Sequence, residues 1–216
     1  MLLPIDFKKM NIKKLILDGE GVTLDFKQAI TNCSKIAKTM VSFANNRGGR
    51  LLVGVADDGK IPGVKSEEEE KYMILKAALS FCKPEIRLVF EEVYVDDKTV
   101  LVVEIPKSYT KPHYALGEDN KWWVYIRVND KSILASSIVV EVLKRGSKET
   151  GVFMEYTLNE KTLLEYLDIN KRITAKEYST MLNLPRRTTQ RILVNLVLSG
   201  IIKIHSTEKD EYYTAS

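Results

Sequence analysis

The segment from Ser42 to Gly59 constrains the fold more than any other part of the sequence. A helical pattern stops at Gly48-Gly49, because glycine readily takes the left-handed conformation that a helix end needs. The apolar run 51–55 follows, and its lack of alternation is typical of a strand covered on both faces. A turn signal at 57–60 comes next. This order predicts helices packed on a sheet.

The flanking segments complete a mixed α+β domain over residues 1–146. In 22–27, Val22, Leu24 and Phe26 alternate with polar residues, which predicts a half-buried strand whose Asp25 and Lys27 face outward. Helices are expected at 32–45, 67–82 and 136–144, and strands at 86–95, 99–105 and 122–128. In this region we expect the tryptophans at 122 and 123 in the core and His113 at the surface.

A polar segment with two glycines, 144–151, separates this domain from a second one at 155–216. Capping boxes at 157–160 and 174–177 open two helices, and Pro185 lies in the first turn of a third that Gly200 ends. Two short strands, 201–205 and 211–214, flank a polar turn. Three helices followed by a hairpin predict a small winged helix-turn-helix domain.

The basic residues concentrate in this second domain. The net charge is only +4, yet residues 171–203 hold seven basic residues and one acidic residue. On the third helix, Arg187, Gln190, Arg191 and Val194 share the side opposite the apolar stripe, and arginine and glutamine can bond base edges in the major groove. We therefore expect DNA contacts from the following residues: Lys171, Arg172, Arg186, Arg187, Gln190 and Arg191. A winged helix used only for protein contacts is the alternative.

Composition excludes several other classes. The 216 residues include two cysteines outside any CxxC pair and two distant histidines, so neither a disulfide scaffold nor a zincin site is expected. No apolar run is long enough to span a membrane. Apolar residues precede the first lysines, the reverse of a secretory signal, so a cytoplasmic protein is expected. No GxxxxGK[ST] loop occurs, so nucleotide hydrolysis and cofactors are not expected.

An acidic set in the first domain supports a second hypothesis. Glu20 precedes the first strand, Asp25 and Lys27 lie on it, and Asp57 and Asp58 follow a later strand. Carboxylates beside a lysine suit a metal-dependent nuclease that acts on DNA or structured RNA. In this hypothesis Glu20, Asp25 and Asp57 or Asp58 hold Mg²⁺ or Mn²⁺, and Lys27 stabilises charge on the phosphate.

Three segments carry a resemblance to a known family. GEGVTLDFK at 19–27 resembles the GESxxLEFK opening of the Schlafen/AlbA-like DNA-binding domain family, and 42–59 resembles its AFANTxGGxLxIGVDDxG signature. Lys111-Pro112, followed by YIRV at 125–128, is similar to its later KPxx…YxRxG segment. The match covers roughly residues 10–140. Asp25 stands where the family pattern has glutamate, and Gly21 where it has serine.

The resemblance implies a DNA-binding protein, since such domains often precede a helix-turn-helix domain in bacterial transcriptional regulators. It also implies an acidic triad in ribonuclease relatives, whose members match Glu20, Asp25 and either Asp57 or Asp58. A homodimer is expected because two half-sites multiply specificity for a palindromic operator. The leading prediction is a transcriptional regulator, with the nuclease as its alternative.

Overall fold

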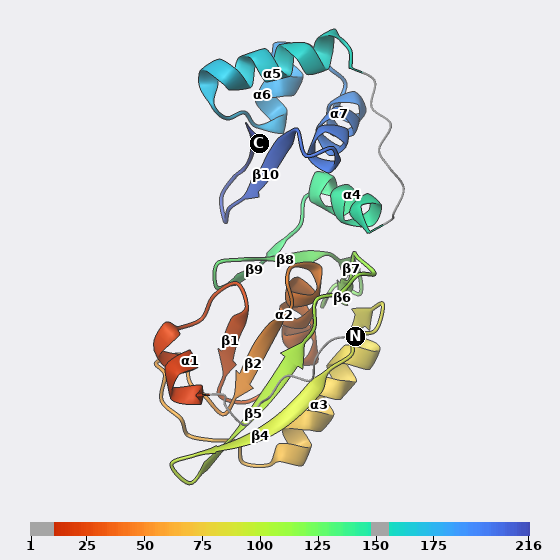
Figure 1. Ribbon diagram of the computed structural model, residues 1–216. Helices are drawn as coiled ribbons and strands as arrows, with labels where there is room; N and C mark the ends of the chain where they lie inside the picture. The colour runs from red at the N-terminus through yellow and green to blue at the C-terminus, as the bar shows by residue number, and fades with distance from the viewer. Residues whose placement is uncertain (1–10, 148–155) are drawn as a thin grey trace. The chain divides into compact units, whose positions relative to one another are not determined.

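The computed structural model describes residues 11–147 and 156–216, which form two compact units divided between Leu134 and Ala135 (Figure 1). The predicted mixed α+β class is confirmed. The predicted domain boundary at 146 falls after helix α4 (Ser137–Gly146), whereas the two units divide before that helix. Within the described ranges, no helix is both long and apolar enough to cross a membrane.

A four-stranded mixed sheet is the centre of the first unit. Its spatial order is β1-β2-β5-β4, with bounds Leu24–Lys27, Gly49–Val53, Lys98–Ile105 and Val89–Val95. β1 runs parallel to β2, because a helix crosses between them, and the other neighbours are antiparallel. The two central strands are therefore paired on both edges.

Helices cover both faces of this sheet (Figure 1). Leu51 and Val53 of β2 pack with α2 (Cys33–Asn45) and α3 (Glu67–Ser80), while Leu52 packs on the opposite face with α1 (Ile12–Asp18). Successive strand residues point to opposite faces of the sheet. Because both faces are covered by helices, the residues on each face of β2 are apolar. The prediction that this strand is buried on both sides is confirmed by its fully buried side chains.

The glycine pair after α2 joins the helix to the sheet. Gly48 has φ +82°, and a Cβ there would lie 2.6 Å from the Lys107 amide nitrogen. At Gly49 an added Cβ would lie 2.6 Å from the Phe43 ring. Glycine is therefore required both for the left-handed turn and for the close approach of two chain segments.

Short strands complete the first unit. β3 (Cys82–Lys83), β6 (Tyr114–Leu116) and β7 (Trp122–Trp123) form one small sheet, and β8 (Tyr125–Val128) with β9 (Lys131–Leu134) forms a hairpin against α2. Two expectations were wrong here. The tryptophans are 41% and 36% exposed, whereas His113 is only 3% exposed because it bonds to neighbouring segments at both ring nitrogens.

The second unit contains four helices and a hairpin in its described part. These are α4, α5 (Leu158–Asn170), α6 (Ala175–Met181), α7 (Arg186–Leu198), β10 (Ile202–Ser206) and β11 (Glu211–Ala215). Both predicted capping boxes are present, with Thr157 and Thr174 as the capping residues. One apolar core holds Leu163, Leu167 and Tyr213 together with residues of α7.

Candidate functional site

The basic residues of α7 lie at its N-terminal half. Arg186, Arg187 and Arg191 are exposed, and Pro185 precedes them with the extended backbone that starts the helix. Ile192, Leu193 and Leu196, which carry the opposite stripe, are buried in the core. The helix therefore buries one side and leaves three guanidinium groups exposed. Guanidinium groups can hydrogen-bond to phosphate oxygens or to base edges.

The turn between α5 and α6 adds two more exposed cations, Lys171 and Arg172. Lys171 ends α5 in the left-handed conformation, with φ +65°. The Arg172 guanidinium carbon lies 5.6 Å from the centre of the Tyr212 ring, which stacks on His205 at 4.9 Å. These contacts hold a planar cation beside the hairpin.

Gln190 and Val194 differ from the expected pattern. The Gln190 side chain donates a hydrogen bond to the Ser137 carbonyl oxygen of α4 at 3.3 Å. Val194 was expected on the exposed side of the helix but is fully buried, because α4 packs against α7 there. The three arginines are therefore the freely exposed part of the predicted reading surface.

The acidic set divides into two places. Asp25 is 3% exposed, although alternation on β1 predicted an outward side chain. The alternation itself is right, but that face is also covered. Asp25 Oδ1 accepts a hydrogen bond from Arg127 Nη2 at 2.8 Å, and its Oδ2 lies 2.9 Å from Lys27 Nζ. Oδ1 is therefore hydrogen-bonded to a cation, whereas the buried Oδ2 lies within ion-pair distance of Lys27 but has no hydrogen-bond partner among the described residues.

Glu20 lies close to this buried ion pair. Its Oε1 accepts a hydrogen bond from the Phe26 amide at 2.7 Å. Burial raises the pKa of the Glu20 carboxyl; the Phe26 amide opposes this shift, and the nearby Asp25 carboxylate adds to it. The structure therefore brings Glu20, Asp25 and Lys27 together.

Asp57 and Asp58 are exposed in the turn after β2, and Asp58 pairs with Lys60 at 2.6 Å, a contact that lowers the pKa of Asp58. Among the residues that the structure describes, no group of three histidine, cysteine or acidic side chains could hold a metal ion. Because the Asp25 oxygens already face two cations, the donors present do not fit Mg²⁺ or Mn²⁺.

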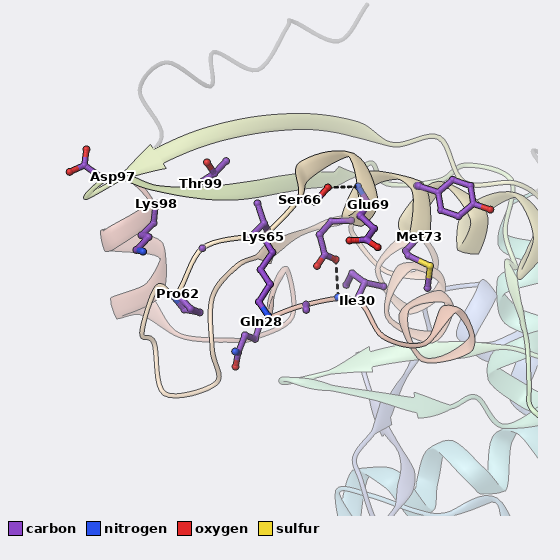
Figure 2. A pocket seen from close by; sticks show the side chains of 15 residues that line it. Gln28, Ile30, Pro62, Lys65, Ser66, Glu69, Met73, Asp97, Lys98 and Thr99 are labelled. Atoms are coloured by element: carbon purple, nitrogen blue, oxygen red, sulfur yellow. Dashed lines mark hydrogen bonds between the residues drawn. The ribbon is translucent and has the colours of Figure 1, made fainter.

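A cavity of about 860 Å³ lies between the first turns of α3 and the turn joining β4 to β5 (Figure 2). Lys65 extends across it toward Gln28, while Glu70 accepts a hydrogen bond from the Ile30 amide at 2.8 Å (Figure 2). The lining mixes lysines with acidic residues: Lys65, Lys98, Glu69, Glu70 and Asp97. Carboxylates on the same wall repel phosphate, so this cavity does not favour nucleic acid.

Two parts of these sites, Arg127 beside Asp25 and helix α4 beside α7, were not predicted from the sequence. Arg127 was noted only as part of the YIRV segment, although it forms a buried ion pair with Asp25 alongside Lys27. Helix α4 was assigned to the first domain, and nothing in its own periodicity indicates that it packs on α7. A buried carboxylate such as that of Asp25 requires a partner. The place of Arg127 in a family motif was the only sequence signal that could have indicated this role.

The match to a known family falls almost entirely within the first unit. The family model described as Schlafen, AlbA_2 matches residues 20–136, more than half of the chain. No curated protein matches the chain. Among solved structures, the N-terminal domain of a RecG-related protein from Nitrosomonas europaea is 22% identical, with a TM-score of 0.42, and the match covers 50% of this chain and 82% of that one. The DIP2311 protein from Corynebacterium diphtheriae is 18% identical, with a TM-score of 0.44, covering 63% and 30% of the respective chains.

Proposed function

Because the chain belongs to the Schlafen AlbA_2 family, which has nucleic-acid-related functions, we propose that it is a DNA-binding transcriptional regulator. The second unit is its winged helix, with α7 as the recognition helix and the β10–β11 hairpin as the wing. Support comes from the element order and from the backbone pairing of Ile173 with Tyr213, which adds a third segment to the hairpin.

The observation that carries this proposal is the exposure of Arg186, Arg187 and Arg191 on one helix. In helix-turn-helix proteins the N-terminal residues of the recognition helix contact base edges. Lys171 and Arg172 flank them as phosphate contacts, which fix orientation without reading sequence. Most of the predicted cations are thus available to a polyanion.

Neutralising Arg187 and Arg191 together tests the proposal. We expect Arg187→Ala/Arg191→Ala to weaken binding to a labelled DNA duplex, since each lost base contact costs about 1–3 kcal/mol. The slope of log affinity against log salt should also fall by about 2, because two counterions fewer are released. Fluorescence anisotropy across a salt series measures both quantities.

The matched control is Lys65→Ala/Lys76→Ala, which removes the same charge from exposed positions of the first unit, one just before α3 and one within it. This control should keep the parental affinity and salt slope. If the arginine double variant binds DNA as the parent does, α7 is not the reading element. Preference for a structured RNA over the duplex would overturn the assignment to DNA.

A homodimer belongs to the same proposal. Two copies of α7 would read two half-sites about one helical turn apart, or a multiple of it. Sedimentation equilibrium of the protein alone and with DNA measures the stoichiometry. One copy per operator would contradict this part of the proposal and leave α7 as the reader.

A further inference from the structure

Helix α4 packs along α7 within the second unit. Ser137 at its start bonds to Gln190, and a Cβ on Gly146 at its end would lie 3.5 Å from Leu198. Ile138 is 7% exposed and joins the same apolar core as α7, with Val142 packed against that core. The contacts therefore extend over the length of α4.

The surface that α4 occupies adjoins the three exposed arginines. A hollow of about 240 Å³ is lined by residues of α4 (Glu141 and Arg145) together with residues of α7 (Arg187, Gln190, Arg191 and Val194). Gln190, whose amide is suited to adenine, instead donates to an α4 carbonyl oxygen. Val194 is completely covered. One side of the predicted reading surface is therefore engaged by another helix of the same chain.

The width of the major groove decides whether both helices fit. The groove is about 12 Å wide, and one helix with its side chains is about 10–12 Å across. A second helix alongside α7 exceeds that width. We propose that α4 is an autoinhibitory cover, which prevents α7 from entering the major groove until α4 is displaced; this inference rests on the DNA-binding function proposed above.

Weakening the packing of α4 in the full-length protein tests whether this helix inhibits DNA binding by α7. Val142→Gln removes an apolar contact with the core, and Val140→Gln is the matched control, since Val140 is on the same helix but outside that core cluster. We expect Val142→Gln to bind a mixed-sequence duplex about tenfold more tightly than the parent, because apparent affinity scales with the fraction of binding-competent molecules. Hydrogen exchange of the α4 amides should accelerate in the same variant.

The gain in affinity separates a cover from a merely structural helix, whose loosening would weaken binding. The pair Ile138→Gln/Val142→Gln is measured alongside, so that α4 is released even if one contact is insufficient. Faster α4 exchange with unchanged or weaker DNA binding overturns the cover and leaves the DNA-binding function in place. If neither the parent nor the loosened variants bind DNA, both proposals fail.

Discussion

At the scale of single residues, the buried pair of Arg127 and Asp25 decides the chemistry of the first unit. The Arg127 guanidinium also donates to the Gly21 carbonyl oxygen at 3.0 Å and lies 4.9 Å from the centre of the Phe43 ring. One side chain thus joins the start of β1, helix α2 and the β8–β9 hairpin. Alternation on β1 correctly placed Asp25 on the face opposite Leu24 and Phe26, but it did not predict burial there, because the Arg127 partner is 102 residues away, beyond the reach of local pattern.

Replacing Arg127 should therefore cost much more than replacing an arginine in a surface pair. We expect Arg127→Met to lower the free energy of unfolding by about 3–5 kcal/mol, because Asp25 is left as a buried, incompletely compensated charge. Arg50→Met is the control, since Arg50 pairs with Glu104 in a more exposed place and should lose only about 0–1 kcal/mol. Urea unfolding at neutral pH measures both, and equal losses would contradict the structural role of Arg127.

At the scale of elements, local signals predicted helices α2 to α7 well, missed α1, and predicted the short strands poorly. Capping boxes and the glycine pair indicate helix ends directly, because they satisfy backbone groups within a few residues. The segments β3, β6 and β7 are two or three residues long; β3 exists through pairing with β6, which is distant in the sequence, and β7 pairs with β6 across a short turn. Helix α4 was predicted as a helix, but the core it joins depends on tertiary contacts that periodicity does not encode.

The loop before β6 contains a buried titratable side chain, that of His113. His113 faces the Pro84 carbonyl oxygen at 2.9 Å and the Ser108 hydroxyl at 2.7 Å, and Asn45 bonds to its backbone. Burial lowers the pKa of His113; the Pro84 contact opposes this shift, and the positive charge of Lys111 adds to it. The unfolded chain then binds the proton more readily than the folded protein does.

Stability from His113 should accordingly be present above its ordinary pKa of 6.5 and be lost as pH falls through the lower folded value. We expect His113→Gln to be less stable than the parent at neutral pH but to lose less stability on acidification to about pH 5. Urea midpoints across this pH range measure the difference. Parallel pH profiles for the parent and the variant would show that His113 does not contribute to the pH dependence of stability.

At the scale of the whole molecule, each of the two units is built around apolar clusters of its own. The first unit packs helices on a sheet, whereas the second packs helices and a hairpin around residues such as Leu163, Leu167 and Leu193. The predicted family is confirmed by the family match, and the predicted α+β class by the structure. The exposure of Arg187 and Arg191 was predicted from their spacing on the helix, but the packing of α4 against α7 was not.

Damage to one core should stay local. Leu167→Ala truncates a side chain that is 1% exposed and should destabilise the second unit by about 2–5 kcal/mol. Hydrogen exchange should accelerate in the slowest amides of α5 and α7 while those of β2 and β5 keep their parental rates. Equal acceleration in both units would mean that the chain unfolds as one cooperative block.

The strand order β1-β2-β5-β4 also affects biosynthesis. β2 pairs with β1 early in the chain, yet its other edge must wait for β5, which ends at Ile105. A growing polypeptide therefore leaves the ribosome with one edge of its most apolar strand uncovered during synthesis of the next fifty or so residues, at about 5–20 residues per second. During those seconds, chaperones and neighbouring nascent chains compete with β5 for that edge.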